Sequence, residues 1–154
     1  MKLKVRPAKE NDLMLIFKWA NDPLTRKMSF NQNPISLETH KEWFYKIVAT
    51  HTHLFIVEGK NLDNWLPVAQ VRVDKNGEIS MSLASEFRGQ HLATPVIKTV
   101  IDYCGNFNLP LKELVAHIKP ENIASIKTFK RAGFHFVRET MINQHPCLEY
   151  IYKI

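Results

Sequence analysis

The stretch "SEFRGQHLATPVIKTVIDYC" (85–104) constrains the fold most, because it links a strand pattern to a helix pattern. Residues 78–83 alternate between polar and apolar side chains, which is typical of a strand. Thr94 followed by Pro95 predicts a helix start, since threonine caps helices and proline suits the first helical position. "ELVAHI" (113–118) predicts a further strand. Crossovers through a helix join parallel strands, so we expect a parallel pair, with a slot between its strands if they splay apart.

The remaining patterns predict strands and helices around this crossover. Residues 24–34 are expected to be irregular, because "NDP" at 21–23 ends the first helix, and "DKNG" at 74–77 predicts a hairpin turn. The expected strands are 2–6, 53–58, 67–74, 134–139 and 147–154, and the other expected helices follow the capping residues Asn11, Ser36 and Asn122. The order predicts an α/β class, α+β in detail, with one central mixed, mostly antiparallel sheet and flanking helices.

The loop 87–93 predicts an anion site in front of the central helix. Unpaired backbone N–H groups and the positive end of the helix dipole lie there, and Arg88 adds a cation. The loop lacks the lysine and spacing of a P-loop and the three glycines of a dinucleotide fingerprint. We therefore expect a phosphate group at this loop, and a plainly capped helix with a solvated arginine is the alternative.

Length and charge limit the partners. The 154 residues suit a single domain, 1–154, and the net charge of +6 favours an acidic partner such as a phosphorylated small molecule. The basic residues are scattered, so we expect no nucleic acid, and no apolar run approaches the ~20 residues of a membrane span. Without a secretory pattern at the N-terminus, a cytoplasmic location is expected.

Cysteines and histidines give no sign of a metal or a disulfide. Cys104 and Cys147 sit in apolar segments and are expected to be reduced core residues. His51 and His53 form a His-x-His pair, but no third ligand has the spacing of a metal site, so we expect no metal.

Two motifs resemble the GCN5-related N-acetyltransferases. "FRGQHLA" is similar to the acyl-CoA loop of this family, Arg/Gln-x-x-Gly-x-Gly/Ala, with Arg88 and Ala93 matching and His91 in place of the usual glycine. "PENIASIKTFKRAGF" (120–134) is similar to the family's Asn-x-x-Ser/Ala helix that ends in Gly-Phe. The resemblance covers nearly the full chain and implies an acyl-CoA N-acyltransferase fold with a splayed parallel strand pair.

The resemblance also implies a place for acetyl-CoA, the expected co-substrate. Its pyrophosphate would rest on the backbone of 88–93, and its pantetheine would pair with strand 81–83. The expected coenzyme contacts are Met81, Ser82, Leu83, Arg88, Gly89, Gln90, His91, Leu92, Ala93, Thr94, Asn122, Ser125 and Phe129.

The acceptor is expected to be a small-molecule amine. Residues 17–44 resemble a subgroup associated with nucleotide-sugar chemistry, the acetyltransferases of 4-amino sugars on the way to pseudaminic and related acids. Arg26 is the best candidate for a substrate phosphate, because its guanidinium matches phosphate oxygens. The full set of expected acceptor residues is Asn21, Asp22, Arg26, Phe30, His40, Gln70 and Arg72.

Acetyl transfer requires a neutral amine, and hence a base or a water chain. His40, in the first turns of its helix, and Glu78, on the strand face shared with Ser80 and Ser82, are the candidate bases. In the family a tyrosine often protonates the thiolate, but Phe129 stands at the expected place, so Ser125, another tyrosine or water is needed unless the thiolate leaves unprotonated.

The leading hypothesis is thus an acetyl-CoA-dependent N-acetyltransferase of a nucleotide-linked amino sugar. Acetylation of a protein N-terminus or another small amine is the first alternative, and a non-catalytic acyl-CoA-binding module is the second. A homodimer is a further possibility. Nucleic-acid binding is the weakest alternative, since only the positive charge supports it.

Overall fold

The computed structural model describes residues 1–50, 53–106 and 110–154. A short 3-10 turn at Glu10–Asp12 precedes the first helix. The helices are α1 (Leu13–Ala20), α2 (Pro23–Met28), α3 (Leu37–Ala49), α4 (Ala93–Asn106) and α5 (Ile123–Arg131). The strands are β1 (Lys2–Pro7), β2 (His53–Asn61), β3 (Asn64–Val73), β4 (Ile79–Leu83), β5 (Glu113–Ile118), β6 (His135–Ile142) and β7 (His145–Lys153).

The strands form two antiparallel sheets instead of the single mixed sheet expected from the sequence. One sheet has the order β1-β2-β3-β4 and the other the order β5-β7-β6. Between them, β4 and β5 run parallel and touch at one bridge, Glu78 with Val115. Beyond this bridge the described residues show no further pairing between the two strands, so β4 and β5 are parallel, as the crossover predicted, and splayed, as the family resemblance implies.

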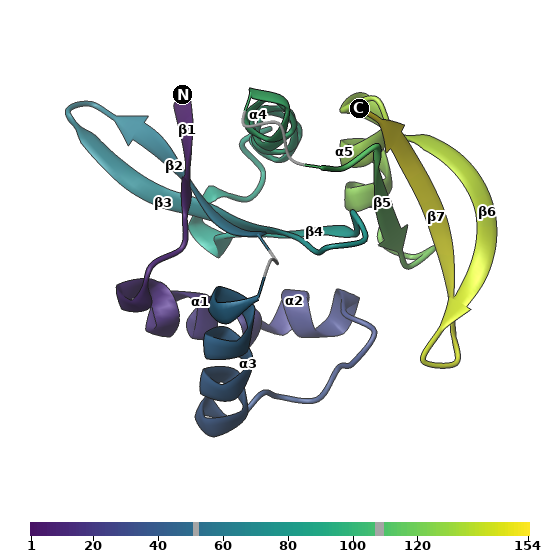
Figure 1. The fold of residues 1–154 in the computed structure, drawn as a ribbon, viewed down its shortest axis with the longest axis horizontal. Coiled ribbons are helices and arrows are strands. Elements are labelled where there is room, and N and C mark those ends of the chain that lie inside the picture. The colour runs from purple at the N-terminus through teal and green to yellow at the C-terminus, as the bar shows by residue number, and fades with distance from the viewer. Residues whose placement is uncertain (51–52, 107–109) are drawn as a thin grey trace.

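Helices cover both faces of the larger sheet (Figure 1). On one face α4 buries Val96, Ile97 and Val100 against the sheet, in a core that continues under α5 and β5. On the opposite face α1 and α3 bury a second cluster around Ile16, Phe44 and Ile56. The apolar stripes of α1, α3, α4 and α5 therefore face the sheets, as helical spacing predicts.

Gly77 sets the contact between the two sheets. Its φ of +85° is in the left-handed region, and a Cβ there would lie only 2.4 Å from the carbonyl oxygen of Glu113. The carbonyl of Gly77 accepts a hydrogen bond of 2.9 Å from the backbone N–H of Val115. A side chain at residue 77 would push the turn off β5, so glycine allows the two backbones to approach.

Two helix starts differ from the sequence expectation. Residues 23–28 form α2 instead of irregular chain, because Asp22 accepts from Thr25 N and Pro23 fits the first turn. The central helix begins at Ala93, and the backbone N–H of Val96 bonds Leu92 O at 2.9 Å. Thr94 is therefore inside the helix, and its hydroxyl lies 3.4 Å from Thr128 O.

Both cysteines are buried and free, as expected. Burial raises the pKa of the Cys104 thiol to about 11, which keeps it protonated and unreactive near neutral pH. In the described parts of the chain no helix has the length and apolar character needed to cross a membrane.

Candidate active site

A cleft of about 580 Å³ opens in front of α4 and along α5. Its walls are the end of β4, the loop before α4 and one face of α5. The lining residues are Leu83, Gly89, His91, Leu92, Ala93, Thr94, Ile123, Ala124, Lys127, Thr128 and Arg131. The cleft thus contains most of the loop in which the sequence predicts an anion.

The cations of this cleft come from α5. Lys127 and Arg131 are exposed and lie four residues apart, so they share the helix face that lines the cleft. Sequence reasoning missed both. Ile123, Lys127 and Arg131 are spaced four residues apart, so they lie on one face of the helix. This spacing is the sequence feature from which both cations could have been predicted.

Left-handed backbone shapes the loop before α4. Gly89 has a φ of 75° and His91 a φ of 59°. For a residue with a Cβ this conformation costs roughly 1–2 kcal/mol, so His91 bears a strain that the usual family glycine avoids. The His91 side chain is exposed. Gln90 is not among the lining residues, and its Nε2 donates to the carbonyl of Glu86 at 3.0 Å.

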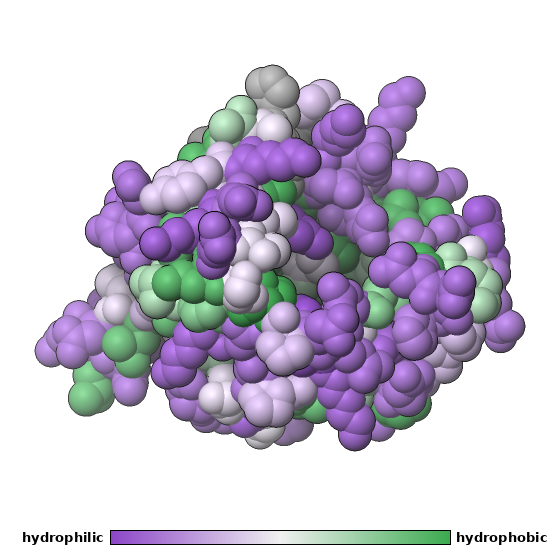
Figure 2. Space-filling view, turned by 90° about the horizontal axis from the view of Figure 1, so that it is seen from below, coloured by the Kyte–Doolittle hydropathy of each residue, from purple (hydrophilic) through white to green (hydrophobic). Residues whose placement is uncertain are grey.

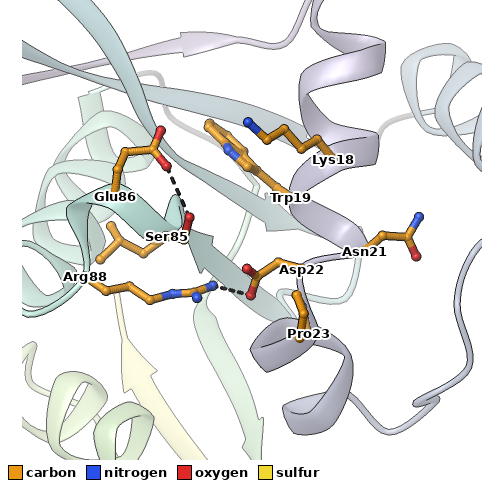
Figure 3. A pocket seen from close by; sticks show the side chains of 9 residues that line it. Lys18, Trp19, Asn21, Asp22, Pro23, Ser85, Glu86 and Arg88 are labelled. Carbon is orange, nitrogen blue, oxygen red and sulfur yellow. Dashed lines mark hydrogen bonds and ion pairs between the residues drawn. The ribbon is translucent and has the colours of Figure 1, made fainter.

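The side chain of Arg88 points away from the anion cleft, contrary to the expectation from the sequence. Its Nη2 donates to Asp22 Oδ2 at 2.6 Å and lies 3.4 Å from Thr25 Oγ1, as Figure 3 shows for the ion pair. The hydrogen bond from Arg88 holds the pKa of the Asp22 carboxyl below its ordinary value. Arg88 therefore connects the loop before α4 to the start of α2.

A second, smaller pocket of about 240 Å³ is lined by both residues of this ion pair (Figure 3). Its lining residues are Lys18, Trp19, Asn21, Asp22, Pro23, Leu83, Ser85, Glu86 and Arg88. Leu83, the last residue of β4, lines both this pocket and the cleft. The molecular face on the side of α1–α3 is mostly hydrophilic and is hollowed near its centre (Figure 2).

Arg26 is a structural residue, so its expected contact with a substrate phosphate is wrong. Its Nε donates to Ala20 O at 2.7 Å, and its Nη1 donates to Asn31 O at 2.8 Å. Its Nη2 contacts the hydroxyl of Ser29 at 3.2 Å. These bonds hold α2 and the following loop against the end of α1. They leave the guanidinium without a free pair of N–H donors for bidentate binding of a phosphate.

Asn21 and Phe30 hold the same loop in place. Asn21 Nδ2 donates to Ile35 O and its Oδ1 accepts from Ile35 N, both at 2.8 Å. Phe30 lies with its ring 6.0 Å from Nζ of the buried Lys119, at the end of β5. Lys119 in turn donates to Lys27 O at 3.2 Å, so the 23–35 segment is anchored to β5.

His40 is buried and does not reach either pocket, so its expected roles as base and acceptor contact are wrong. Only 1% of it is exposed, and its Nε2 lies 2.9 Å from Leu13 O. Since a carbonyl oxygen only accepts, Nε2 carries the hydrogen. Burial lowers the pKa of His40, and the bond to Leu13 partly opposes this effect. A neutral ring thus joins α3 to α1.

The expected coenzyme contacts on α5 have structural roles. Asn122 caps the helix, with its Oδ1 accepting from Ser125 N at 3.2 Å. Phe129 is buried in the core and packs edge-on against Phe134, with ring centroids 5.0 Å apart. Phe129 is not among the cleft-lining residues, and its neighbour Thr128 is. The acid role of Ser125 stays a prediction.

The free edge of β4 faces the splay. On its other edge β4 pairs with β3, where Gln70 stands opposite Ser82 and Arg72 opposite Ser80. Gln70 Nε2 donates to Ser82 Oγ at 3.2 Å, while its buried Oε1 has no hydrogen-bond partner among the described residues. The guanidinium carbon of Arg72 lies 5.7 Å from the centre of the Trp43 ring.

Three side chains that sequence reasoning did not combine meet where the sheets join. His117 on β5 lies 3.1 Å through Nδ1 from Glu78 Oε1 and 3.1 Å through Nε2 from Glu149 Oε1. Arg138 Nη1 lies 3.4 Å from the other oxygen of Glu149. By the two-residue period, Glu78 shares its strand face with Ser80 and Ser82. Among the residues that the structure describes, no group of three or more acidic, histidine or cysteine side chains could hold a metal ion. His51 lies outside the described residues.

The sequence matches the family profile described as "Acetyltransferase (GNAT) domain" over residues 2–135, so the chain belongs to the GNAT acetyltransferase family. The description of this family is that of an acetyltransferase domain. The uncharacterised protein MJ1062 of Methanocaldococcus jannaschii is 27% identical over 158 residues. That alignment covers 99% of this chain and 31% of MJ1062, so the chain spans about a third of that relative.

Solved structures share the fold. A domain from Methanocaldococcus jannaschii has a TM-score of 0.85 at 24% identity, over 99% of each chain. The spermidine N-acetyltransferase of Vibrio cholerae, solved with CoA and spermine, has a TM-score of 0.82 at 19% identity over 98% of this chain and 95% of that one. AAC(6′)-Ib with ribostamycin and coenzyme A has a TM-score of 0.81 at 16% identity over 99% and 94%.

Proposed function

We propose that the coenzyme and the acceptor occupy the two hollows that share Leu83. The pyrophosphate of acetyl-CoA lies at the start of α4, beside Lys127 and Arg131, where N–H groups and two cations favour an anion. The pantetheine follows the unpaired edge of β4. The acceptor enters from the pocket beside Trp19 and Asp22. The shared residue at the end of β4 is the observation that carries this arrangement, because it brings amine and thioester together.

The acceptor under this proposal is an amino sugar linked to a nucleotide. The resemblance of residues 17–44 to sugar acetyltransferases supports it, since this segment builds α2 and much of the smaller pocket. Arg26 is not given the phosphate contact, because Nε and both Nη atoms already donate within the fold. Lys18 lines the pocket with an exposed side chain and takes that role.

A small polyamine or an aminoglycoside is the second candidate. Asp22 and Glu86 line the same pocket and could hold a second ammonium group. Asp22 is already paired with Arg88, which leaves Glu86 as the available carboxylate of this pocket. One available carboxylate beside the cation Lys18 suits a substrate that carries both charges better than it suits a polycation. We therefore rank the nucleotide-linked amino sugar above the polyamine and the aminoglycoside as the acceptor.

The chemistry needs few groups. Glu78 lies at the other end of β4 from Leu83, so it takes the proton of the acceptor ammonium through a chain of waters, and the neutral amine attacks the thioester carbonyl. Backbone N–H groups on the free edge of β4 stabilise the oxyanion. The C–S bond then breaks, and the thiolate accepts the second proton of the attacking nitrogen, directly or through water.

The test is release of coenzyme A thiol from acetyl-CoA with a panel of UDP-linked 4-amino sugars, spermidine, kanamycin and a peptide with a free N-terminus. We expect the highest kcat/KM with a UDP-linked amino sugar. A higher kcat/KM with spermidine or kanamycin would indicate that the acceptor is a polyamine or an aminoglycoside. A higher kcat/KM with the peptide would indicate that the acceptor is a protein N-terminus. If acetyl-CoA binds but no amine of the panel causes release of the coenzyme A thiol, the chain is a non-catalytic acyl-CoA-binding module.

A further inference from the structure

The smaller pocket contains an ion pair that the proposed chemistry does not use. Asp22, the cap of α2, and Arg88, in the loop before α4, both line this pocket and point toward each other (Figure 3). The contact joins one oxygen to one nitrogen, Asp22 Oδ2 to Arg88 Nη2, at 2.6 Å. The side chains of Asp22 and Arg88 are 21% and 29% exposed, so a ligand can reach both.

The protein donors to Asp22 all meet a single oxygen. Oδ2 accepts from Arg88, from Thr25 N at 3.1 Å and from Thr25 Oγ1 at 3.3 Å. Oδ1 accepts no hydrogen bond from the described residues. The hydrogen bond from Arg88 holds the pKa of Asp22 below its ordinary value, so the group is a carboxylate at neutral pH. Oδ1 is therefore an open acceptor on a carboxylate that the fold already holds in place.

The guanidinium of Arg88 is open in the complementary way. Arginine has five N–H donors, and here Nη2 has two acceptors, Asp22 Oδ2 and Thr25 Oγ1. Within the part of the chain that the structure describes, Nε and Nη1 donate to no protein atom. The pair thus combines free donors, a free acceptor and no net charge. A hydroxyl group suits this combination, because it both donates and accepts, whereas an ammonium group only donates.

The rest of the pocket suits a small ring that carries hydroxyls. Trp19, Pro23 and Leu83 supply apolar surface, and a few polar groups among apolar walls fix the orientation of a small ligand. At about 240 Å³ the pocket is smaller than the ~300–1,000 Å³ typical of ligand sites, so we place a single sugar ring in it. Leu83, where amine and thioester meet under the proposed function, lines the same pocket. The hydroxyl that meets the pair is then one close to the reacting amine.

We propose that Asp22 and Arg88 recognise the acceptor through the ring hydroxyl next to its reacting amine, an inference that rests on the proposed function. Asp22 Oδ1 accepts the hydroxyl hydrogen, and Nε or Nη1 of Arg88 donates to a hydroxyl oxygen. Because the pair has no net charge, it leaves the ammonium to Glu86 and the phosphate to Lys18. The pair therefore selects amino sugars over amines without a hydroxyl, such as spermidine.

The test compares the best amino-sugar acceptor of the panel with its analogue in which hydrogen replaces the hydroxyl next to the amine. The ratio of the two kcat/KM values is measured for the wild type, Asp22→Ser and Arg88→Gln. Serine also caps helices, so Asp22→Ser keeps the start of α2 but removes the open oxygen. Glutamine keeps an N–H donor for Asp22 but lacks the rest of the guanidinium. Asp63→Ser, in the exposed turn between β2 and β3, is the control for the loss of a negative charge.

The wild type and Asp63→Ser should prefer the acceptor with the hydroxyl by about 10-fold or more, as expected for hydrogen bonds to charged groups. In Asp22→Ser and Arg88→Gln this ratio should fall toward one. The KM for acetyl-CoA and the melting temperature are measured alongside. A wild-type ratio near one would overturn the proposal. So would an unchanged ratio in both variants, and a higher KM for acetyl-CoA or a lower melting temperature would then show that the pair is only structural.

The outcomes also separate this proposal from that of a nucleotide-linked acceptor. If kanamycin is the best acceptor and the ratio falls in the variants, the pair recognises a sugar hydroxyl but the acceptor carries no nucleotide. If a UDP-linked amino sugar is best and the ratio does not depend on the pair, the proposed acceptor stands and the hydroxyl contact is wrong. A higher kcat/KM with spermidine or the peptide than with any amino sugar would contradict both proposals.

Discussion

Single side chains in the acceptor half were the hardest to interpret from the sequence. Arg26 and His40 have the chemistry of a phosphate ligand and a base, yet their partners are backbone carbonyls. A carbonyl partner leaves no trace in the residue pattern, because every residue carries one. Arg88 was placed correctly in the loop, but the motif could not show that Asp22, 66 residues away, holds its side chain.

His40 gives a prediction at this scale. Because burial lowers its pKa below the ordinary value of 6.5, the folded protein takes up this proton at lower pH than the unfolded chain. Stability is therefore full above pH 6.5 and falls as the pH drops below it, by up to about 1.4 kcal/mol per pH unit for one proton. His40→Gln, which keeps an N–H for Leu13, should flatten this slope.

Urea unfolding at pH 7.5 and pH 5 measures this effect. His135→Gln serves as the control, since it removes an exposed histidine and should leave the slope unchanged. Equal slopes for the wild type and His40→Gln would show that His40 does not set the acid sensitivity.

At the scale of elements, the order of strands and helices could be predicted because periodicity and capping are local. The missed α2 shows the limit, since Asp22 and Pro23 end one helix and begin the next. The division into two sheets could not be predicted from periodicity, because it depends on contacts between distant segments. The bridge of Glu78 with Val115 is one such contact, and it needs the close approach at Gly77.

Gly77→Ala tests this joint. Its positive φ costs about 1–3 kcal/mol for a residue with a Cβ, and the contact with Glu113 O adds to that. We expect a lower free energy of unfolding in urea and weaker acetyl-CoA binding, because the turn must move off β5. The control is Gly105→Ala on α4, where a Cβ meets nothing within 4 Å. It should be neutral or stabilising by about 0.5–1 kcal/mol. An equal loss of unfolding free energy in both variants would contradict the claim that Gly77 is needed for the close approach of the two sheets.

On the scale of the whole molecule, the coenzyme half was more predictable than the acceptor half. The loop 88–93 and the Asn122-capped helix flank one cleft because local motifs set both helix starts. The cations Lys127 and Arg131 lie on the cleft face of α5, whereas Phe129 turns into the core. Which face of α5 meets the cleft is decided by packing against β5 and α4, which the sequence does not display.

The measurement closest to the central claim is calorimetric titration of acetyl-CoA into the wild type, Lys127→Glu and Lys130→Glu. The two variants make the same charge change on the same helix, but only Lys127 lines the cleft. We expect one site per chain and an affinity at least 10-fold weaker for Lys127→Glu, with salt reducing the difference. Lys130→Glu should bind nearly as the wild type does. Equal losses in both variants, or none in Lys127→Glu, would contradict coenzyme binding between α4 and α5.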